Sequence, residues 1–132
     1  MLRKCFLIFA LTATWFAADS ALAEKFTRTL RSPATVKGLI GGESHDSYSI
    51  HAYAGQTMTV RISWKPEHDS ESGDNHAEFF VSDSPEFGGD VTFGRASDDG
   101  KNWTGKVPKT GNYYIYVMGH PWAHYILKVA VK

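Results

Sequence analysis

The stretch YSIHAYAGQTMTVRISW, residues 48–64, contains two segments in which apolar and polar residues alternate. The alternation restarts across Ala54-Gly55-Gln56. Side chains of a β-strand point alternately to its two sides, so each segment predicts a half-buried strand. Gly55 supplies the permissive backbone of a tight turn, and the pattern predicts a β-hairpin. The inward-facing residues would be Tyr48, Ile50 and Ala52, then Met58, Val60, Ile62 and Trp64.

Short apolar segments of the same kind continue along the chain, each bounded by Gly, Pro, Asn or Asp. No segment has helical spacing, so the pattern predicts an all-β fold of about eight strands, an antiparallel sandwich or small barrel. Tyr113–Met118 and Tyr125–Val131 carry apolar residues on both faces, which predicts central strands. The other expected strands are Phe26–Leu30, Ala34–Ile40, Ala77–Val81, Val91–Arg95 and Trp103–Val107.

The N-terminal segment is typical of a secretory signal. Arg3 and Lys4 precede an apolar run, Phe6–Phe16, and Ala21-Leu22-Ala23 supplies the small residues of a cleavage site. The run is too short to span a bilayer of about 30 Å. We therefore expect residues 1–23 to be removed, and residues 24–132 to form a single domain in the periplasm or outside the cell. The lone cysteine, Cys5, would leave with the signal.

The charge of the expected domain is nearly balanced. Removal of residues 1–23 leaves 12 Lys and Arg against 13 Asp and Glu. The sequence contains no basic stripe or polybasic run, which argues against nucleic acid and anionic membranes as main partners.

Ser44, His45 and Asp46 are adjacent in the sequence and suggest a hydrolase triad. Neighbouring residues of an extended chain point to alternate sides, so the three cannot converge as nucleophile, base and orienting group. The sequence also lacks a G-x-S-x-G motif. We expect a protein that is not an enzyme and needs no cofactor.

Two stretches contain residue types that bind metals. Residues 68–76 are rich in His, Asp and Glu, but the acids only partly fit a calcium loop. His120 and His124 flank Pro121 in a strand-to-strand loop, and further zinc ligands are not evident. We expect a solvated loop and a turn, and no metal site.

Four short elements occur in order along the chain: V-x-G-x-I in VKGLI, A-x-A-G-Q in AYAGQ, P-x-T-G-x-Y in PKTGNY, and Y-x-L-x-V in YILKV. With them, Val36 to Val131 resembles the bacterial pre-peptidase C-terminal domain and is most similar to periplasmic inhibitors of g-type lysozyme. The resemblance implies a jelly-roll-like β-sandwich that inhibits such a lysozyme by inserting a loop into its cleft. The alternative function is that of a stand-alone accessory module that binds carbohydrate or cell-wall polymer.

The resemblance also implies where the lysozyme is contacted. In the stretch GGDVTFGRA, Asp90-Val91-Thr92-Phe93 replaces the Ser-Val-Asp-Leu motif of the inhibitors, and Arg95 follows. Asp90, Thr92, Arg95 and Tyr48 are the expected partner-binding residues. Arg95 could instead pair with Asp98 or Asp99, and the alternation of Tyr48 with Ile50 favours a place in the core.

Several aromatic residues fall off the expected core face. Tyr114, Tyr116 and Trp122, together with Tyr53, could form an exposed patch for a sugar or a protein. A second layer or a long loop could equally cover them.

Overall fold

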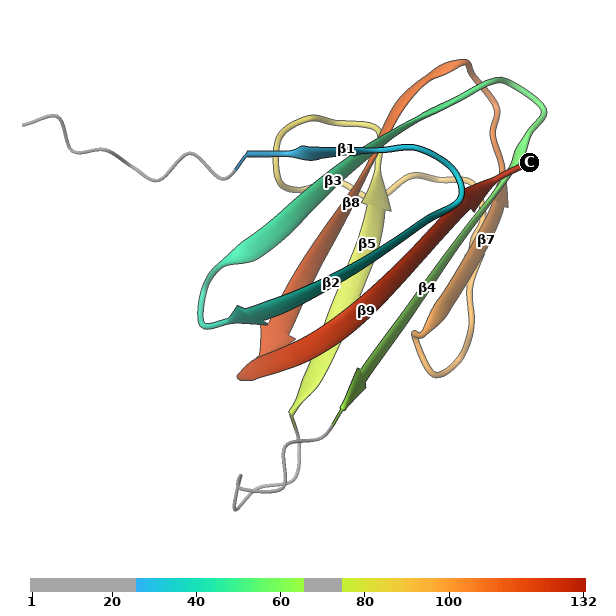
Figure 1. Ribbon diagram of the computed structural model, residues 1–132. Helices are drawn as coiled ribbons and strands as arrows, with labels where there is room; N and C mark the ends of the chain where they lie inside the picture. Colours follow the sequence, from blue (N-terminus) through green and yellow to red (C-terminus); the bar gives the residue numbers. More distant parts are fainter. Residues whose placement is uncertain (1–25, 66–74) are drawn as a thin grey trace, which may run out of the picture.

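The computed structural model describes residues 26–65 and 75–132, which form two β-sheets packed face to face (Figure 1). The expected signal segment 1–23 and residues 68–74 of the polar stretch lie outside the described residues. The part of the chain that the structure describes contains no helical segment that could cross a bilayer. Its strands are β1 (Arg28–Leu30), β2 (Ala34–Gly41), β3 (His45–Ala52), β4 (Thr57–Lys65), β5 (His76–Ser82), β6 (Arg95–Ala96), β7 (Asn102–Lys106), β8 (Gly111–His120) and β9 (Trp122–Val131).

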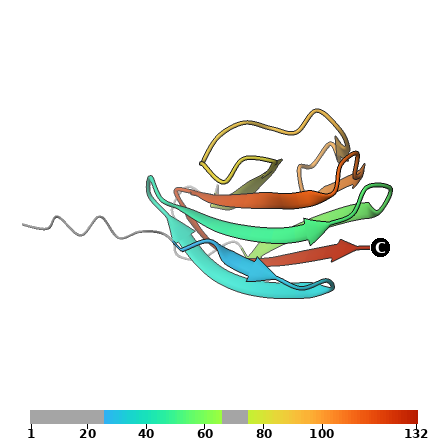
Figure 2. The ribbon, with the colours of Figure 1, turned by 90° about the horizontal axis from the view of Figure 1, so that it is seen from above.

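The two sheets have the strand orders β1-β3-β8-β5 and β2-β9-β4-β7-β6. Figure 2 shows them as two stacked layers. All pairs are antiparallel except β1 with β3, which is parallel. The predicted all-β sandwich is therefore confirmed. So is the central position of the two strands that are apolar on both faces, because β8 lies between β3 and β5, and β9 between β2 and β4.

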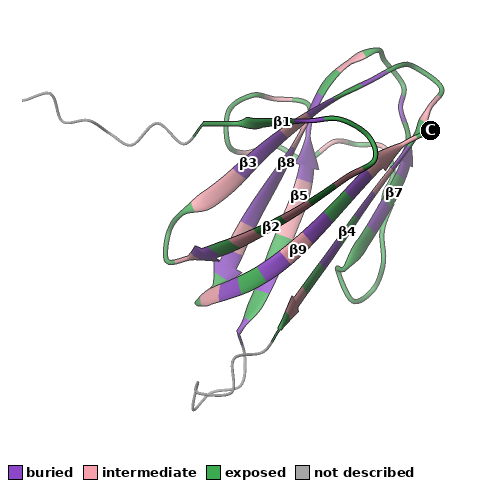
Figure 3. Ribbon diagram, in the orientation of Figure 1, coloured by how far each residue is buried: buried purple, intermediate pink, exposed green. Residues whose placement is uncertain are grey.

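The core lies between the sheets and is filled by every second side chain of the long strands (Figure 3). In β4 the core residues Met58 and Val60 are fully buried, whereas Arg61 between the core positions is exposed. In β3 the core residues are Tyr48, Ile50 and Ala52. The alternation predicted from the sequence thus identifies the buried face of each strand.

The predicted hairpin is wrong. β3 pairs with β1 and β8 in one sheet, and β4 pairs with β7 and β9 in the other. Tyr48 and Met58 therefore point into the same core from opposite sides, and the turn between the strands crosses from sheet to sheet. Alternation shows which side chains are buried, but it does not show which strand lies alongside.

The turn between β3 and β4 is held by hydrogen bonds to the turn before β8. The amide of Ala54 donates to Oγ1 of Thr110 at 2.9 Å, and the amide of Gly55 donates to the carbonyl of Val107 at 2.8 Å. Gly55 has a φ of 92°, a conformation that glycine adopts without steric cost. The A-x-A-G-Q and P-x-T-G-x-Y elements are therefore neighbours in space, which gives a physical reason for their occurring together.

The expected strand Val91–Arg95 is also wrong for most of its length, because β6 contains only Arg95 and Ala96. Gly94 before it has a φ of 85°, which is incompatible with an extended strand. The expected strand Phe26–Leu30 is confirmed for its last three residues, which form the edge strand β1.

Candidate functional site

The connection between β5 and β7, residues 83–101, carries the loop residues predicted to bind a partner. Asp90 and Thr92 are exposed, whereas Val91 and Phe93 are half-buried and pack against the core. The amide of Val91 donates to the carbonyl of Val81 at 3.0 Å. Alternation therefore persists over residues 90–93 without a regular strand, and it directs Asp90 and Thr92 outward.

The position of Arg95 is fixed by the two residues before it. The ring of Phe93 meets that of Trp103 edge-on, with centroids 5.6 Å apart. Gly94 lies so close to the same indole that a Cβ there would be 2.3 Å from Cζ2 of Trp103. Arg95 then begins β6, which pairs with β7. Its backbone is therefore held by the sheet, and its side chain is exposed.

The guanidinium of Arg95 is not engaged by the nearby acids. Asp99 instead accepts hydrogen bonds from Oγ of Ser97 at 2.6 Å and from the amide of Lys101 at 3.0 Å. The bond from Ser97, followed by that from Lys101, lowers the pKa of Asp99. Among the described residues, no ion pair joins Arg95 to Asp98 or Asp99, so this cation is available to a partner.

Tyr48, the fourth predicted partner-binding residue, is 2% exposed and lies in the core. Its hydroxyl is 2.5 Å from that of Tyr125 in the opposite sheet, and the Tyr125 hydroxyl donates to Oδ2 of Asp46 at 2.6 Å. Burial raises the pKa of both tyrosines. Tyr48 therefore belongs to a polar link between the sheets and not to the surface that carries Asp90.

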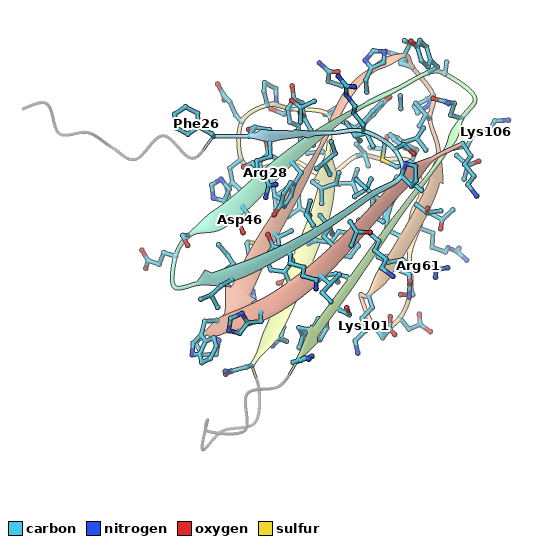
Figure 4. All side chains as sticks on the ribbon, viewed as in Figure 1. Phe26, Arg28, Asp46, Arg61, Lys101 and Lys106 are labelled. Atoms are coloured by element: carbon cyan, nitrogen blue, oxygen red, sulfur yellow. The ribbon has the colours of Figure 1, made fainter. Side chains whose placement is uncertain are left out.

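A cleft of about 240 Å³ opens at the edge of the sandwich beside this link. Figure 4 shows three of its residues, Phe26, Arg28 and Asp46, at the β1 side of the molecule. The guanidinium carbon of Arg28 lies 5.9 Å from the centroid of the Tyr48 ring. No sequence pattern points to the cleft, because three strands and the residues before β1 contribute to it. Its lining residues are Phe26, Arg28, Lys37, Gly38, Leu39, Asp46, Ser47 and Tyr48.

The three residues of the suspected triad have separate partners. Oγ of Ser44 donates to the carbonyl of Gly41 at 2.8 Å. The ring of His45 stacks on Phe87 with centroids 4.1 Å apart, and Asp46 accepts from the tyrosine of the opposite sheet. These three contacts lead to three different places: the turn before β3, the aromatic ring of Phe87, and the interior between the sheets.

The first part of the β5–β7 connection folds back over the outer face of the four-stranded sheet, and Figure 2 shows this segment arching over β8. The hydroxyl of Tyr116 donates to the carbonyl of Ser84 at 2.7 Å, and only 1% of Tyr116 is exposed. Phe87 packs against both Tyr116 and Phe80 with centroids 5.4 Å away, and is itself 49% exposed. This aromatic cluster of His45, Phe80, Phe87 and Tyr116 is a site that the sequence patterns did not predict.

The predicted aromatic patch is divided between the two sheets. Tyr114 and Tyr116 are neighbours on β8, with parallel rings whose centroids are 6.5 Å apart. Trp122 lies on β9 in the other sheet, where its ring meets that of His124. Tyr116 is covered by a long loop, which was the alternative to an exposed patch, and Tyr114 is half-buried. The only sequence signal for Phe87 is its isolation among turn-forming residues in SDSPEFGGD.

No group of three possible metal-binding side chains occurs within residues 26–65 and 75–132. Nε2 of His120 lies 3.0 Å from Glu78 across β5 and β8, and its ring stacks on that of His76 with centroids 4.9 Å apart. His124 lies on β9 beside Trp122. Ring contacts and a hydrogen bond between His120 and Glu78 are thus among the contacts at the His-rich end of the sandwich.

Solved structures confirm the resemblance seen in the sequence. The chain is 27% identical to PliG of Aeromonas hydrophila, a periplasmic lysozyme inhibitor of g-type lysozyme, with a TM-score of 0.59 over 80% of this chain and 96% of that chain. PliG of Salmonella Typhimurium is 18% identical, with a TM-score of 0.53 over 80% and 98% of the two chains. The pre-peptidase C-terminal domain of a Bacillus anthracis collagenase is 20% identical, with a TM-score of 0.55 over 82% and 96%. No protein-family model and no curated protein matches the chain.

Proposed function

We propose that this protein is an exported, non-enzymatic inhibitor of a g-type lysozyme, which it contacts through Asp90, Thr92 and Arg95 of the β5–β7 connection. The likeness to the Aeromonas inhibitor supports the class of partner, because 27% identity extends over 80% of this chain. The periplasmic location of that inhibitor and the signal-like residues 1–23 support export.

The observation that carries the proposal is the exposed guanidinium of Arg95 on a fixed backbone. Glycosidases of the lysozyme type act through a pair of carboxyl groups. A guanidinium forms strong, charge-assisted hydrogen bonds with a carboxylate. Because Phe93 and Gly94 already hold the loop against Trp103, little conformational freedom is lost on binding.

An inhibition assay against several lysozymes tests the proposal. Purified protein at micromolar concentration should suppress the activity of a g-type lysozyme and leave c-type and i-type enzymes largely active. Unchanged activity of g-type lysozymes would contradict the proposed partner. Equal suppression of all three types would contradict the proposed specificity.

A second candidate function is the binding of carbohydrate or cell-wall polymer by the aromatic cluster. The observation that favours it is Phe87, which is half-exposed and stacked on His45, because a contiguous aromatic surface is more informative than scattered rings. Retention on a polymer should be lost in Phe87→Ala and kept in Trp122→Ala, since Trp122 lies in the other sheet. No retention on any polymer would rule this candidate out.

A further inference from the structure

The strands of the five-stranded sheet contain no Asp or Glu. Four of these strands, β2, β4, β7 and β9, carry exposed cations, and these cations form the basic face. The fifth strand, β6, contributes Arg95, which is part of the candidate loop and not of the basic face. The residues of the basic face are Lys37, Arg61, Lys65, Lys106 and Lys128.

Strand register places these cations on one side of the sheet, away from the core. Lys128 is paired with Arg61, and Lys106 with Thr57, at exposed positions between core residues. Figure 4 shows Arg61 and Lys106, with Lys101 beside them, along the β4 and β7 side of the molecule. The expectation of no basic stripe is therefore wrong, because the stripe is assembled from four strands and does not exist as a run in the sequence.

Arg61 and Lys128 are directly opposite each other on adjacent strands. Like charges in this position destabilise a sheet. Within the described residues, neither side chain forms an ion pair with a carboxylate. A bound anion would relieve the repulsion, so this pair points to an anionic ligand.

Half of the acidic residues in the described part of the chain lie on β5 or in the segment that follows it, while Asp98 and Asp99 lie in the β6–β7 turn at the edge of the five-stranded sheet. Glu78 lies on β5 of the four-stranded sheet, and Asp83, Glu86 and Asp90 lie in the connection that follows it. The chain has a formal net charge of +0, but the strands of the five-stranded sheet carry cations and no carboxylates. Such a distribution orients a protein in the field of an anionic surface.

We propose that the basic face docks on the surface of a membrane that contains anionic phospholipids. The cations extend over three strand spacings, roughly 14 Å, and along β4 over eight residues, roughly 26 Å. This two-dimensional spread matches an array of phosphate headgroups better than a linear polyanion, whose charges follow a line. Each Lys or Arg near an anionic leaflet contributes its own attraction of about 1 kcal/mol, so several cations on one face add up.

Apolar side chains on the same face favour a lipid surface over an acidic protein. Leu39 is 59% exposed on β2 and pairs with His124 of β9. The half-buried Trp122 and Ile126 lie diagonally from Leu39 on the same outer side of β9. Tryptophan is enriched at membrane interfaces, where one part of the ring is apolar and the other is wet. Cations and apolar side chains together are the features of a surface that lies on a bilayer.

Vesicle co-sedimentation tests the proposal with a matched pair of variants. Purified protein should bind vesicles of phosphatidylethanolamine and phosphatidylglycerol, should not bind vesicles of phosphatidylcholine, and should dissociate as salt is raised. Arg61→Gln/Lys128→Gln should weaken binding by about 25-fold, at roughly fivefold for each cation. Arg31→Gln/Lys109→Gln changes the net charge equally in exposed loops and should stay within about twofold of the original protein.

The Arg61/Lys128 variant should melt at the same temperature or higher, because it loses a repulsive pair, so weaker binding would not reflect unfolding. If the Arg61/Lys128 variant unfolds, the double variant Lys37→Gln/Lys65→Gln replaces it in the co-sedimentation experiment, and the same weakening of binding is expected. Three results would each overturn the proposal. The protein could fail to bind anionic vesicles, both double variants could lose binding equally, or the protein could bind polyphosphate or DNA but no vesicles. Inhibition of lysozyme should be unaffected by either double variant.

Discussion

The ring of Tyr125 lies across Gly38 on the adjacent strand, so closely that a Cβ at position 38 would be 2.6 Å from its Cζ atom. This glycine is the centre of the V-x-G-x-I element, and the tyrosine is the first residue of Y-x-L-x-V. Because Gly38 has no side chain, the phenol can cross the interior and reach Tyr48 and Asp46 in the opposite sheet. The two elements therefore cooperate to link the sheets.

Gly38→Ala should destabilise the protein by about 1–3 kcal/mol, because the added methyl group overpacks the Tyr125 ring. Urea unfolding measures the change. Gly111→Ala is the matched control, since a Cβ there would meet no atom within 4 Å, and it should cause no loss of stability. Equal destabilisation by both substitutions would show that close packing at Gly38 is unimportant.

High pH should weaken the fold through its buried tyrosines. Burial raises the pKa of Tyr48, Tyr116 and Tyr125, so the folded state keeps their protons at a pH where the unfolded chain, with a tyrosine pKa of about 10, releases them. The stability they contribute is complete below pH 10 and is lost as the pH rises above it. Each such tyrosine lowers the free energy of unfolding by about 1.4 kcal/mol per pH unit in that range.

Tyr125→Phe should be less stable than the original protein at neutral pH by about 1–3 kcal/mol, because buried hydrogen bonds are lost. Above pH 10 its stability should fall less steeply, since one buried ionisable group has been removed. Denaturant unfolding at several pH values measures both effects. An unchanged pH dependence would mean that Tyr125 ionises as readily in the folded chain as in the unfolded one.

Gly94→Ala should destabilise the candidate loop. Gly94 has a φ of 85°, and a Cβ there would clash with the Trp103 indole. Gly100→Ala is the control for backbone strain alone, because Gly100 has a φ of 68° and open space around it. We expect about 1 kcal/mol of destabilisation for Gly100→Ala and about 1–3 kcal/mol more for Gly94→Ala. Similar values for both would show that contact with Trp103 does not hold the loop.

The alternation of residues predicted the class of fold and the buried face of each long strand. It did so because burial on one face of a strand leaves a period of two in the sequence. β8 and β9 could also be placed centrally, since their apolar residues lie on both faces. The pairing of β3 with β8, and of β4 with β9, depends on contacts between residues far apart in the sequence. A compact turn such as that at Gly55 therefore gives the same local pattern whether it joins two strands of a hairpin or crosses between sheets.

The candidate site was less predictable for the same reason. Phe87 covers Tyr116 only because the β5–β7 connection folds back over the sheet, and no local pattern predicts that path. The basic face arises because Arg61 and Lys128, distant in sequence, become cross-strand neighbours. The resemblance to lysozyme inhibitors points to Arg95, but only the fold brings the Ser97 hydroxyl to Asp99, which leaves the guanidinium without that carboxylate as a partner.

The central claim is that Arg95 inserts its guanidinium into the cleft of a g-type lysozyme, and its most direct test is the inhibition constant of Arg95→Ala beside that of Arg31→Ala. Both side chains are exposed, so neither change should alter the fold. Arg95→Ala should weaken inhibition by at least about 30-fold, as for an anchoring residue worth about 2 kcal/mol, while Arg31→Ala should retain the original constant. Inhibition by Arg95→Ala as strong as that by the unmodified protein would contradict the claim.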